Sequence, residues 1–419
     1  MSTLLRATPR SLVWLIIAWT VTRLALLGGI LGIVPYPDGP LVINDVLLYS
    51  EWSQLLVTGR FPIGDDMWQY PPGAGVIFAL TSAWGISPVV GFFVIALLAD
   101  AGVLAVLAVT GVRRHAGLTA AWVWVASAIV IGPVFLARFD LLPTAMAVLA
   151  LVLISRPALS GGAAALGTLL KVWPGLTLLA LPRRSLVCGA TGFVVTAIAV
   201  LIAVSLWATG GVSFVGEQQA RGLQVESVAA WPYLVAQGLG VSVPLEFRFG
   251  AMEIDLPITI AIGTVVTGIG LLAIGALGVA RLLGMLESIP GPDVVLTALL
   301  ISMVTSRVLS PQYGVWLAGI AAVVLLDSRT RMRPVIGLIA LSLLVTQVIY
   351  PFGYGSLLSG TWWAIGLHSV RILALVAAMV WAIAIIIAQR DPVSLRRSTP
   401  ESQRGPGAGC SIMPLPPGR

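Results

Sequence analysis

Long apolar stretches are the feature that most constrains the fold of this chain. They recur from Ser11 almost to Gln389, and each is close to the ~20 residues that an α-helix needs to cross the hydrocarbon core of a bilayer. Only 10% of the residues are charged, whereas a water-soluble domain keeps about a quarter of its residues charged. Because apolar and polar residues do not alternate, helices are favoured over a barrel. The sequence predicts an all-α polytopic membrane protein.

The basic residues form short clusters between the apolar stretches. Such clusters are retained on the cytoplasmic side of a membrane, so the net charge of +7 reports topology, and nucleic acid is not expected as a partner. We predict a multi-pass protein of the plasma (inner) membrane with both termini in the cytoplasm, a retained first span, and no disulfide between Cys188 and Cys410. The clusters are Arg6/Arg10, Arg113/Arg114, Arg183/Arg184, Arg329/Arg331/Arg333 and Arg390/Arg396/Arg397.

About twelve membrane segments are expected within a single membrane domain, residues 1–389. The short stretch 73–86 is expected to be re-entrant, and 158–182 to form a hairpin of two short helices interrupted at Lys171. A single crossing over 158–182 is the alternative, but it would leave Arg183/Arg184 outside. Two large outer segments, about 35–87 and 210–255, hold most of the acidic residues. The polar tail, 390–419, is expected to be disordered.

The first outer segment contains a predicted amphipathic helix. Apolar and aromatic residues recur at helical spacing from Val46 to Leu56, which is typical of a helix lying at the membrane surface. Asp45 is expected at the N-terminal end of this helix, where a carboxylate can accept backbone N–H groups. A helix cap without further function is the alternative for this residue. Gln69-Tyr70-Pro71-Pro72 then forms a rigid turn back to the membrane.

Four stretches in this order resemble the GT-C glycosyltransferases, and most closely their family 87 of actinobacterial mannosyltransferases that use polyprenyl-phosphomannose. Asp45 with Tyr70-Pro71-Pro72 is similar to the family's first outer loop. Lys171-Val172-Trp173-Pro174 resembles its Lys-x-x-Pro segment. The third and fourth stretches are Arg221-Gly222-Leu223-Gln224-Val225-Glu226-Ser227 and Arg307-Val308-Leu309-Ser310-Pro311-Gln312-Tyr313.

The resemblance implies transfer of a sugar, with mannose favoured, from a polyprenyl-phosphate donor to a lipid or glycan acceptor on the outer face. Asp45 would be the general base that removes the acceptor's proton, and cations would stabilise the departing phosphate. The expected donor-phosphate ligands are Lys171, Arg307, Arg221 and His368. The expected substrate-binding residues are Asp140, Arg138, Tyr70, Glu226, Gln312 and Tyr313.

Several of these residues could instead have a purely structural role. Lys171 is the only lysine and lies in an apolar stretch, which marks it as functional, although snorkelling to the interface is the competing interpretation. The sequence equally allows a local Arg138–Asp140 salt bridge, a loop-holding role for Glu226, structural ion pairs for Arg221 and Arg307, and an ordinary interfacial His368. Arg23, Asp100 and Arg371 are expected in structural ion pairs.

Metal and cofactor sites have little support in the sequence. The two histidines are predicted on opposite faces, no acid pair has ligand spacing, and no glycine-rich phosphate loop occurs. A transporter or lipid flippase remains the alternative function, since it would also explain the many segments and the intramembrane charges. A scaffold subunit of an envelope-assembly complex is a third hypothesis.

Overall fold

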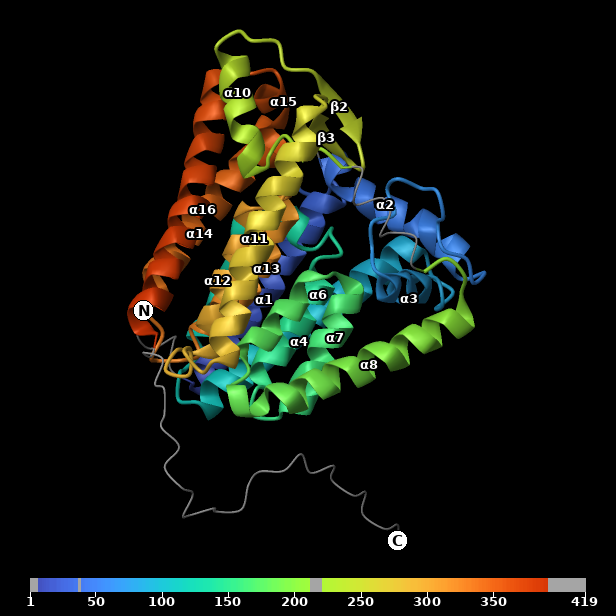
Figure 1. The fold of residues 1–419 in the computed structure, drawn as a ribbon. Helices are drawn as coiled ribbons and strands as arrows, with labels where there is room; N and C mark the ends of the chain where they lie inside the picture. The colour runs from blue at the N-terminus through green and yellow to red at the C-terminus, as the bar shows by residue number, and fades with distance from the viewer. Residues whose placement is uncertain (1–6, 37–38, 212–220, 391–419) are drawn as a thin grey trace, which may run out of the picture.

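The computed structural model describes residues 7–36, 39–211 and 221–390, and these form a bundle of helices with a small cap at one end (Figure 1). The predicted tail and part of the second outer segment lie outside the described residues. The helices of the bundle are α1 (Pro9–Ile30), α3 (Pro72–Thr81), α4 (Pro88–Arg113), α5 (Thr119–Ile131), α6 (Leu141–Val152), α7 (Pro157–Leu170), α8 (Leu186–Trp207), α11 (Ile258–Leu282), α12 (Gly291–Val304), α13 (Gly314–Val324), α14 (Arg333–Gln347) and α16 (Trp362–Gln389).

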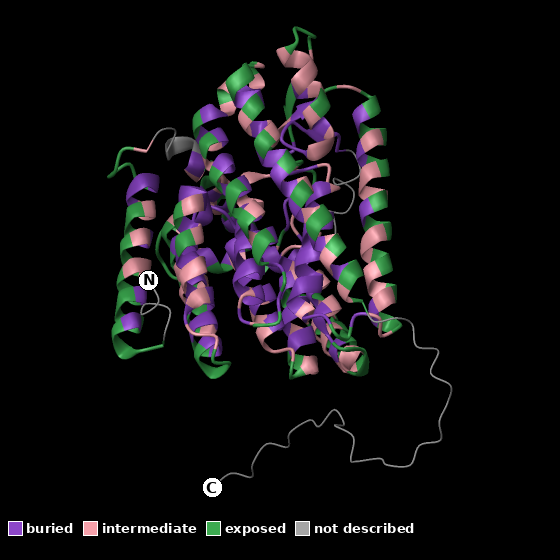
Figure 2. Ribbon diagram, turned by 90° about the vertical axis from the view of Figure 1, so that its left-hand side faces the viewer, coloured by how far each residue is buried: buried purple, intermediate pink, exposed green. Residues whose placement is uncertain are grey.

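Lengths and burial agree with a membrane bundle. In the described part of the chain, six helical segments are long and apolar enough to cross a bilayer, and six shorter apolar helices of 10–17 residues accompany them. Buried residues gather where the helices face one another, and exposed residues line the outside of the peripheral helices (Figure 2). The prediction of an all-α polytopic membrane protein is confirmed.

The chain between α6 and α8 folds back as two short helices, as the sequence predicts. Helix α7 ends at Leu170, Lys171 is extended, and the 3₁₀ helix η2 (Trp173–Ala180) follows. Pro174 lies in the first turn of η2, where its missing N–H costs nothing. The extended residue therefore carries its ammonium group away from both helices.

The cap consists of α2 (Gly39–Leu56), α10 (Trp231–Gly238), α15 (Tyr354–Leu358) and a three-stranded antiparallel sheet in the order β1-β3-β2. The strands are β1 (Leu223–Gln224), β2 (Leu245–Arg248) and β3 (Ala251–Ile254). In Figure 1 the cap lies at the end of the bundle away from the N-terminus.

The expected start of the first-loop helix is wrong. Helix α2 begins at Gly39, six residues before Asp45, so Asp45 lies inside the helix and is not its cap. Pro40 is suited to a first helical turn. Val42 and Val46, four residues apart and both fully buried, extend the apolar stripe toward the N-terminus. The predicted helix, which starts at Asp45, therefore lacks the first turn and a half of α2.

An aromatic cluster fixes α2 on the bundle. Tyr49 stacks on Phe78 of α3 with ring centroids 4.6 Å apart, and Trp52 packs edge-on against Trp68 at 5.0 Å. Phe139 meets Phe78 at 4.8 Å from the turn before α6. Large aromatic side chains bury extensive apolar area and prefer such tilted contacts. Asp45, one turn before Tyr49, is thus carried by a rigid helix.

A fully buried ion pair holds the first helices together. Arg23 of α1 donates to both carboxylate oxygens of Asp100 on α4, at 2.8 Å each. Trp19 and Trp124 donate their indole N–H groups to the same carboxylate at 2.6 and 2.7 Å. The sequence prediction that Arg23 and Asp100 are structural ion-pair members is confirmed.

Candidate active site

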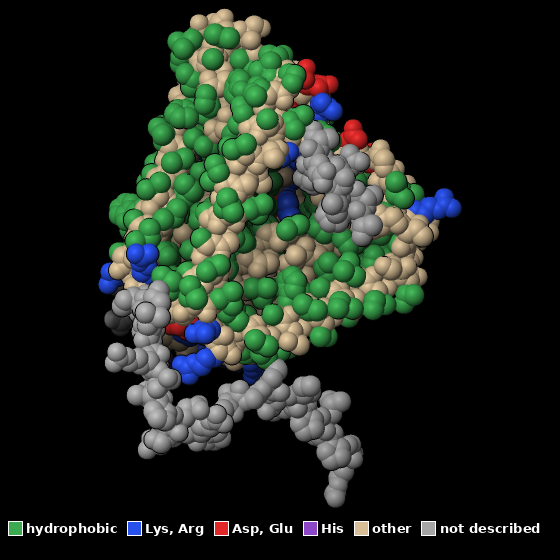
Figure 3. All heavy atoms as spheres, in the orientation of Figure 1, with side chains coloured by type: hydrophobic (Ala, Val, Ile, Leu, Met, Phe, Trp, Pro, Cys, Tyr) green, Lys and Arg blue, Asp and Glu red, His purple; other side chains and the backbone are tan. Residues whose placement is uncertain are grey.

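A polar cavity lies where the cap meets the bundle. Its volume is about 150 Å³, and α2, the turn before α3, Lys171, the sheet and the loop before α13 each contribute to its wall. The surface beside α11 is hollowed there, with Lys or Arg side chains inside the hollow (Figure 3). Of the residues singled out in the sequence, the cavity is lined by Asp45, Tyr70, Lys171, Arg221, Gln312 and Tyr313.

Asp45 is the acidic residue among those lining this cavity. Its carboxylate is 37% exposed, and its Oδ2 accepts from Nε of Arg138 at 2.9 Å. Arg138 is buried in the turn before α6, where it also donates to the carbonyl oxygens of Val42 and Ala137 and to the hydroxyl of Tyr350. The guanidinium therefore fixes one carboxylate oxygen and leaves the other edge of Asp45 toward the cavity.

Lys171 reaches the cavity from the break between α7 and η2. Its Nζ lies 2.7 Å from Oδ1 of Asp140, and the side chain is 20% exposed. Asp140 is fully buried, accepts a second bond from Nε1 of Trp316 at 2.6 Å, and has no hydrogen-bond partner for Oδ2 within the described chain. Lys171 is thus anchored to a buried carboxylate and is itself largely covered.

The local Arg138–Asp140 salt bridge that the sequence allowed as an alternative is not formed. These residues are two apart, yet Arg138 pairs with Asp45 and Asp140 pairs with Lys171. The turn points the two side chains to different partners, so one short segment ties α2 to the α7–η2 break. Asp140 thereby anchors the ammonium group of Lys171.

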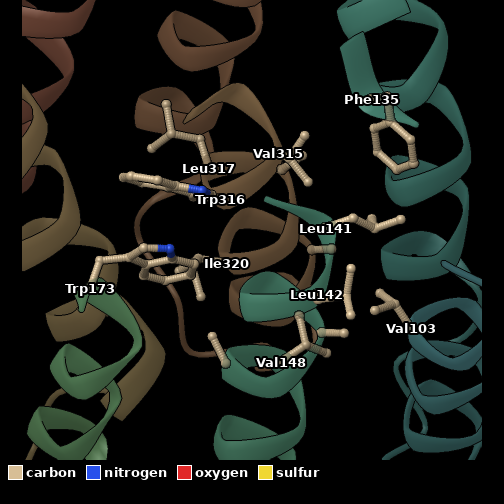
Figure 4. Close-up of a cluster of buried hydrophobic side chains, with 14 of the residues drawn as sticks. Val103, Phe135, Leu141, Leu142, Val148, Trp173, Val315, Trp316, Leu317 and Ile320 are labelled. Atoms are coloured by element: carbon tan, nitrogen blue, oxygen red, sulfur yellow. The ribbon is translucent and has the colours of Figure 1, made fainter. Parts of the chain in front are cut away.

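Aromatic rings enclose the ammonium group of Lys171. Its Nζ lies 5.8 Å from the ring centroid of Tyr70, 5.2 Å from that of Tyr313 and 5.0 Å from that of Trp316. Tyr313 stacks on Trp316 at 3.8 Å, and Trp316 stacks on Trp173 at 5.2 Å; Figure 4 shows the last two rings layered between η2 and α13. Cation–π attraction adds to the ion pair in holding the ammonium group.

Tyr70 contacts both α2 and Lys171. Its hydroxyl lies 3.0 Å from that of Tyr49 on α2. Burial raises the pKa of Tyr70 to about 12, although nearby Lys171 acts in the opposite direction. The phenol therefore remains protonated at neutral pH and can donate a hydrogen bond.

Arg221 closes the cavity from the second outer segment. It donates to Glu253 of β3 at 2.7 Å, to Oε1 of Gln69 at 2.6 Å and to the carbonyl oxygen of Phe249 at 3.1 Å. Arg307 does not line the cavity; its Nη1 donates to the carbonyl oxygen of Arg221 at 2.7 Å. The structure thus brings both arginines together, with Arg307 behind Arg221.

Glu226 and His368 lie away from the cavity wall. Glu226 accepts from Arg371 of α16 at 2.6 Å and from Gln224 at 3.0 Å, so it fastens the second outer segment to the bundle. Burial raises the pKa of Glu226 even beside Arg371. His368 is fully buried on α16, and neither ring nitrogen has a hydrogen-bond partner within the described chain. Neither side chain contributes to the cavity wall.

Sequence reasoning missed four residues that position the cavity side chains. Trp316 follows Tyr313 by three residues, a spacing that places two side chains on the same face of a helix. This spacing could have identified Trp316 as a neighbour of Tyr313. Gln69 precedes the Tyr70-Pro71-Pro72 motif directly. No local signal marks Tyr49 as the partner of Tyr70. Likewise, nothing in the sequence marks Tyr350 as a partner of Arg138, because the two residues are far apart along the chain.

A larger apolar cavity of about 530 Å³ opens between α3, α4, α6, α7 and α8. It begins close to the polar cavity along the chain, because Leu170 precedes Lys171, Leu142 follows Asp140 by two residues, and Gly73 follows Tyr70 by three. Gly73 permits this packing, since a Cβ there would lie 2.7 Å from the carbonyl oxygen of Leu169. Cavities of this size and polarity accommodate apolar ligands.

Within the described residues, no group of three or more His, Cys, Asp or Glu side chains is placed to hold a metal ion.

Comparison with known proteins gives one finding. Residues 68–237 match the model of glycosyltransferase family 87. The matched region contains Tyr70, Arg138, Asp140, Lys171 and Arg221, and it ends before Tyr313. No curated protein and no solved structure matches the chain. The family match supports a GT-C-like glycosyltransferase family, and with it glycosyltransferase activity in a membrane protein.

Proposed function

We propose that this glycosyltransferase transfers mannose from a polyprenyl-phosphate donor to a lipid or glycan acceptor on the outer face of the plasma membrane. One observation carries the proposal: one polar cavity presents the partly exposed carboxylate of Asp45 and the anchored ammonium of Lys171, and Leu170, which directly precedes Lys171, belongs to the wall of a large apolar cavity. A base, a phosphate-binding cation and a place for a lipid chain are what this reaction requires.

The apolar cavity supports a lipid-linked donor. Its wall is formed by aliphatic, methionine and glycine residues of five helices that pack within the membrane part of the bundle. A polyprenyl chain lying there would place its phosphate at the level of Lys171, because Leu169 and Leu170 of the cavity wall directly precede that residue. A nucleotide-sugar donor has no chain to occupy this space.

The transfer is a single displacement. Asp45 takes the proton of the acceptor hydroxyl as the acceptor oxygen attacks the anomeric carbon. The bond from the anomeric carbon to the phosphate oxygen breaks, and polyprenyl phosphate leaves with the electron pair. Lys171 and Arg221 stabilise the negative charge of the phosphate through charge-assisted hydrogen bonds. Because attack and departure occur on opposite faces, a β-linked donor gives an α-linked product.

The positive-inside rule supports an outward orientation of this site. The basic clusters Arg113/Arg114, Arg183/Arg184 and Arg329/Arg331/Arg333 flank helices at the end of the bundle away from the cap. With that end in the cytoplasm, the cap and the polar cavity face outward.

The test is transfer by purified, reconstituted protein supplied with radiolabelled polyprenyl-phosphomannose and a lipid extract of the native host. The Asp45→Asn variant keeps an oxygen that can accept from Arg138, so the fold is retained while the base is lost. We expect its rate to fall by roughly 10²–10⁴-fold. Asp66→Asn, which neutralises an exposed carboxylate of the same outer segment outside the cavity, should behave as wild type.

Mannose in a new lipid product establishes the reaction. Equal product from Asp45→Asn and wild type contradicts the catalytic assignment. No product from wild type with an intact donor contradicts the donor sugar, and repeating the assay with other polyprenyl-phosphate sugars then decides whether the donor class stands.

A further inference from the structure

A second polar cavity lies beside the first, further along α2. Its volume is about 480 Å³, and its wall combines residues of α2 with the loop 60–65 and Thr209 after α8. Leu48 and Trp52 line both this cavity and the catalytic cavity. The two cavities are therefore neighbours separated by one row of side chains. None of the chemistry assigned above uses the second cavity.

Helix periodicity explains how α2 serves both cavities. Asp45, Leu48, Tyr49 and Trp52 form one stripe with the spacing i, i+3, i+4, i+7, and Leu48, Glu51, Trp52 and Leu55 form the same stripe three residues further on. A shift of three residues turns the stripe by roughly 60° and advances it by about 4.5 Å along the helix axis. The second cavity is thus displaced sideways and toward the C-terminus of α2 from Asp45.

The volumes of the two cavities indicate which part of a substrate each can hold. Sites for drug-sized molecules occupy roughly 300–1,000 Å³, and the catalytic cavity, at about 150 Å³, lies below that range while the second lies within it. The catalytic cavity has room for the reacting sugar and little else. The rest of a bound acceptor must therefore extend past Leu48 or Trp52 into the second cavity, or out into solvent.

The side chains of the second cavity indicate its ligand. Asp65 is held in place, since it accepts from Trp52 Nε1 at 2.8 Å and from the Met67 N–H at 2.9 Å. Glu51 and Arg60 are exposed, and neither side chain makes a hydrogen bond or ion pair with the described part of the chain. Two carboxylates against one guanidinium leave a net negative charge, which disfavours phosphate. Carboxylate oxygens instead accept hydrogen bonds from hydroxyl groups.

We infer that the second cavity is an acceptor subsite that binds a neutral, hydroxyl-rich sugar next to the one receiving the transferred group. The inference rests on the proposed function and adds the chemical class of the acceptor. Glu51 accepts from sugar hydroxyls, Arg60 donates to them, and the indole of Trp52 forms the wall shared with the reacting sugar. The enzyme then extends an existing glycan of at least two sugars.

The experiment compares n-octyl α-mannoside with n-octyl α-mannobioside as acceptors at saturating polyprenyl-phosphomannose. For wild type, the second sugar should lower the acceptor KM by about tenfold, the effect of one hydrogen bond to a charged group. Glu51→Gln should lose that gain and leave the donor KM unchanged. Leu55→Trp, which fills the second cavity alone, should lose it too, and Asp66→Asn should keep it.

Each remaining outcome overturns the inference or the proposed function separately. The subsite is overturned if wild type has the same KM for the mannoside and the mannobioside. It is also overturned if the lower KM for the mannobioside persists in both Glu51→Gln and Leu55→Trp. Transfer to the native lipid extract but to neither octyl glycoside overturns the neutral-sugar assignment. No transfer from the donor to any acceptor, extract included, contradicts the proposed function.

Discussion

Replacing Lys171 by methionine tests whether its ammonium group acts on the substrate or only neutralises Asp140. Methionine keeps an unbranched chain and removes the charge. Asp140 is then left fully buried with Trp316 as its one donor within the described chain. Removing one partner of a buried ion pair costs about 3–5 kcal/mol. The midpoint of thermal unfolding of the purified protein should therefore fall, by on the order of 5–10 °C.

The double variant Asp140→Asn, Lys171→Met separates stability from catalysis. An asparagine oxygen still accepts from Trp316, and no buried charge remains without a partner, so the cost should shrink to about 1 kcal/mol. The thermal midpoint should return close to that of wild type. The rate of transfer should stay at least about 100-fold below wild type, because the cation that we propose to stabilise the departing phosphate is still missing.

Two measurements on the same three proteins decide the matter: thermal unfolding in detergent, and initial rates with polyprenyl-phosphomannose. A double variant that regains stability and also regains wild-type rate refutes the reasoning, since Lys171 would then serve only Asp140. A single variant as stable as wild type would refute the cost assigned to the buried carboxylate.

Three further predictions concern the bundle, the pH profile and the lipid chain. Asp100→Ala leaves Arg23 buried without its carboxylate and should lower stability by about 3–5 kcal/mol without changing the KM of the surviving enzyme, as measured by thermal unfolding and kinetics. Because the pKa of Tyr70 is raised to about 12, its phenol stays protonated through pH 10. Tyr70→Phe should therefore lower the rate of transfer by a constant factor across pH 6–10. A pH–rate profile of wild type whose alkaline decline disappears in Tyr70→Phe contradicts this prediction. Gly102→Leu projects into the apolar cavity without a clash and should raise the KM for long-chain donors more than for short-chain ones, whereas Gly366→Leu, equally free of contacts on α16, should not.

The sequence predicts the fold class well because the bilayer allows few solutions. Apolar stretches must form helices in hydrocarbon, and the break at Lys171 is visible because an ionisable residue and a proline interrupt an apolar run. The first turns of α2 were missed because the pattern of Val42 and Val46 was not followed past Asp45. The small sheet was missed because its strands are two to four residues long and lie in a polar segment.

For the candidate site, the sequence was informative only where ionisable residues are rare. One lysine in an apolar segment had to have a function or a partner, and Asp45 was selected from a resemblance in a stretch that lies before the matched residues 68–237. The partners themselves were not predictable: Arg138 and Asp140 are two residues apart and point to different helices, and Glu226 meets Arg371 across 145 residues. Such pairs depend on helix packing, which a single sequence does not encode locally.

One carboxylate pairs with Lys171 and another lines the same cavity as Lys171, and their surroundings favour the second as the proposed base. Asp140 is fully buried, its Oδ1 already accepts from Lys171 and Trp316, and it does not line the cavity. Asp45 is 37% exposed, lines the cavity, and has one oxygen engaged by Arg138. A base must lie within hydrogen-bond reach of the proton that it removes. An acceptor hydroxyl entering the cavity can meet Asp45 directly, whereas Asp140 is buried and does not line the cavity, so that even its Oδ2, which has no hydrogen-bond partner within the described chain, is out of reach from there.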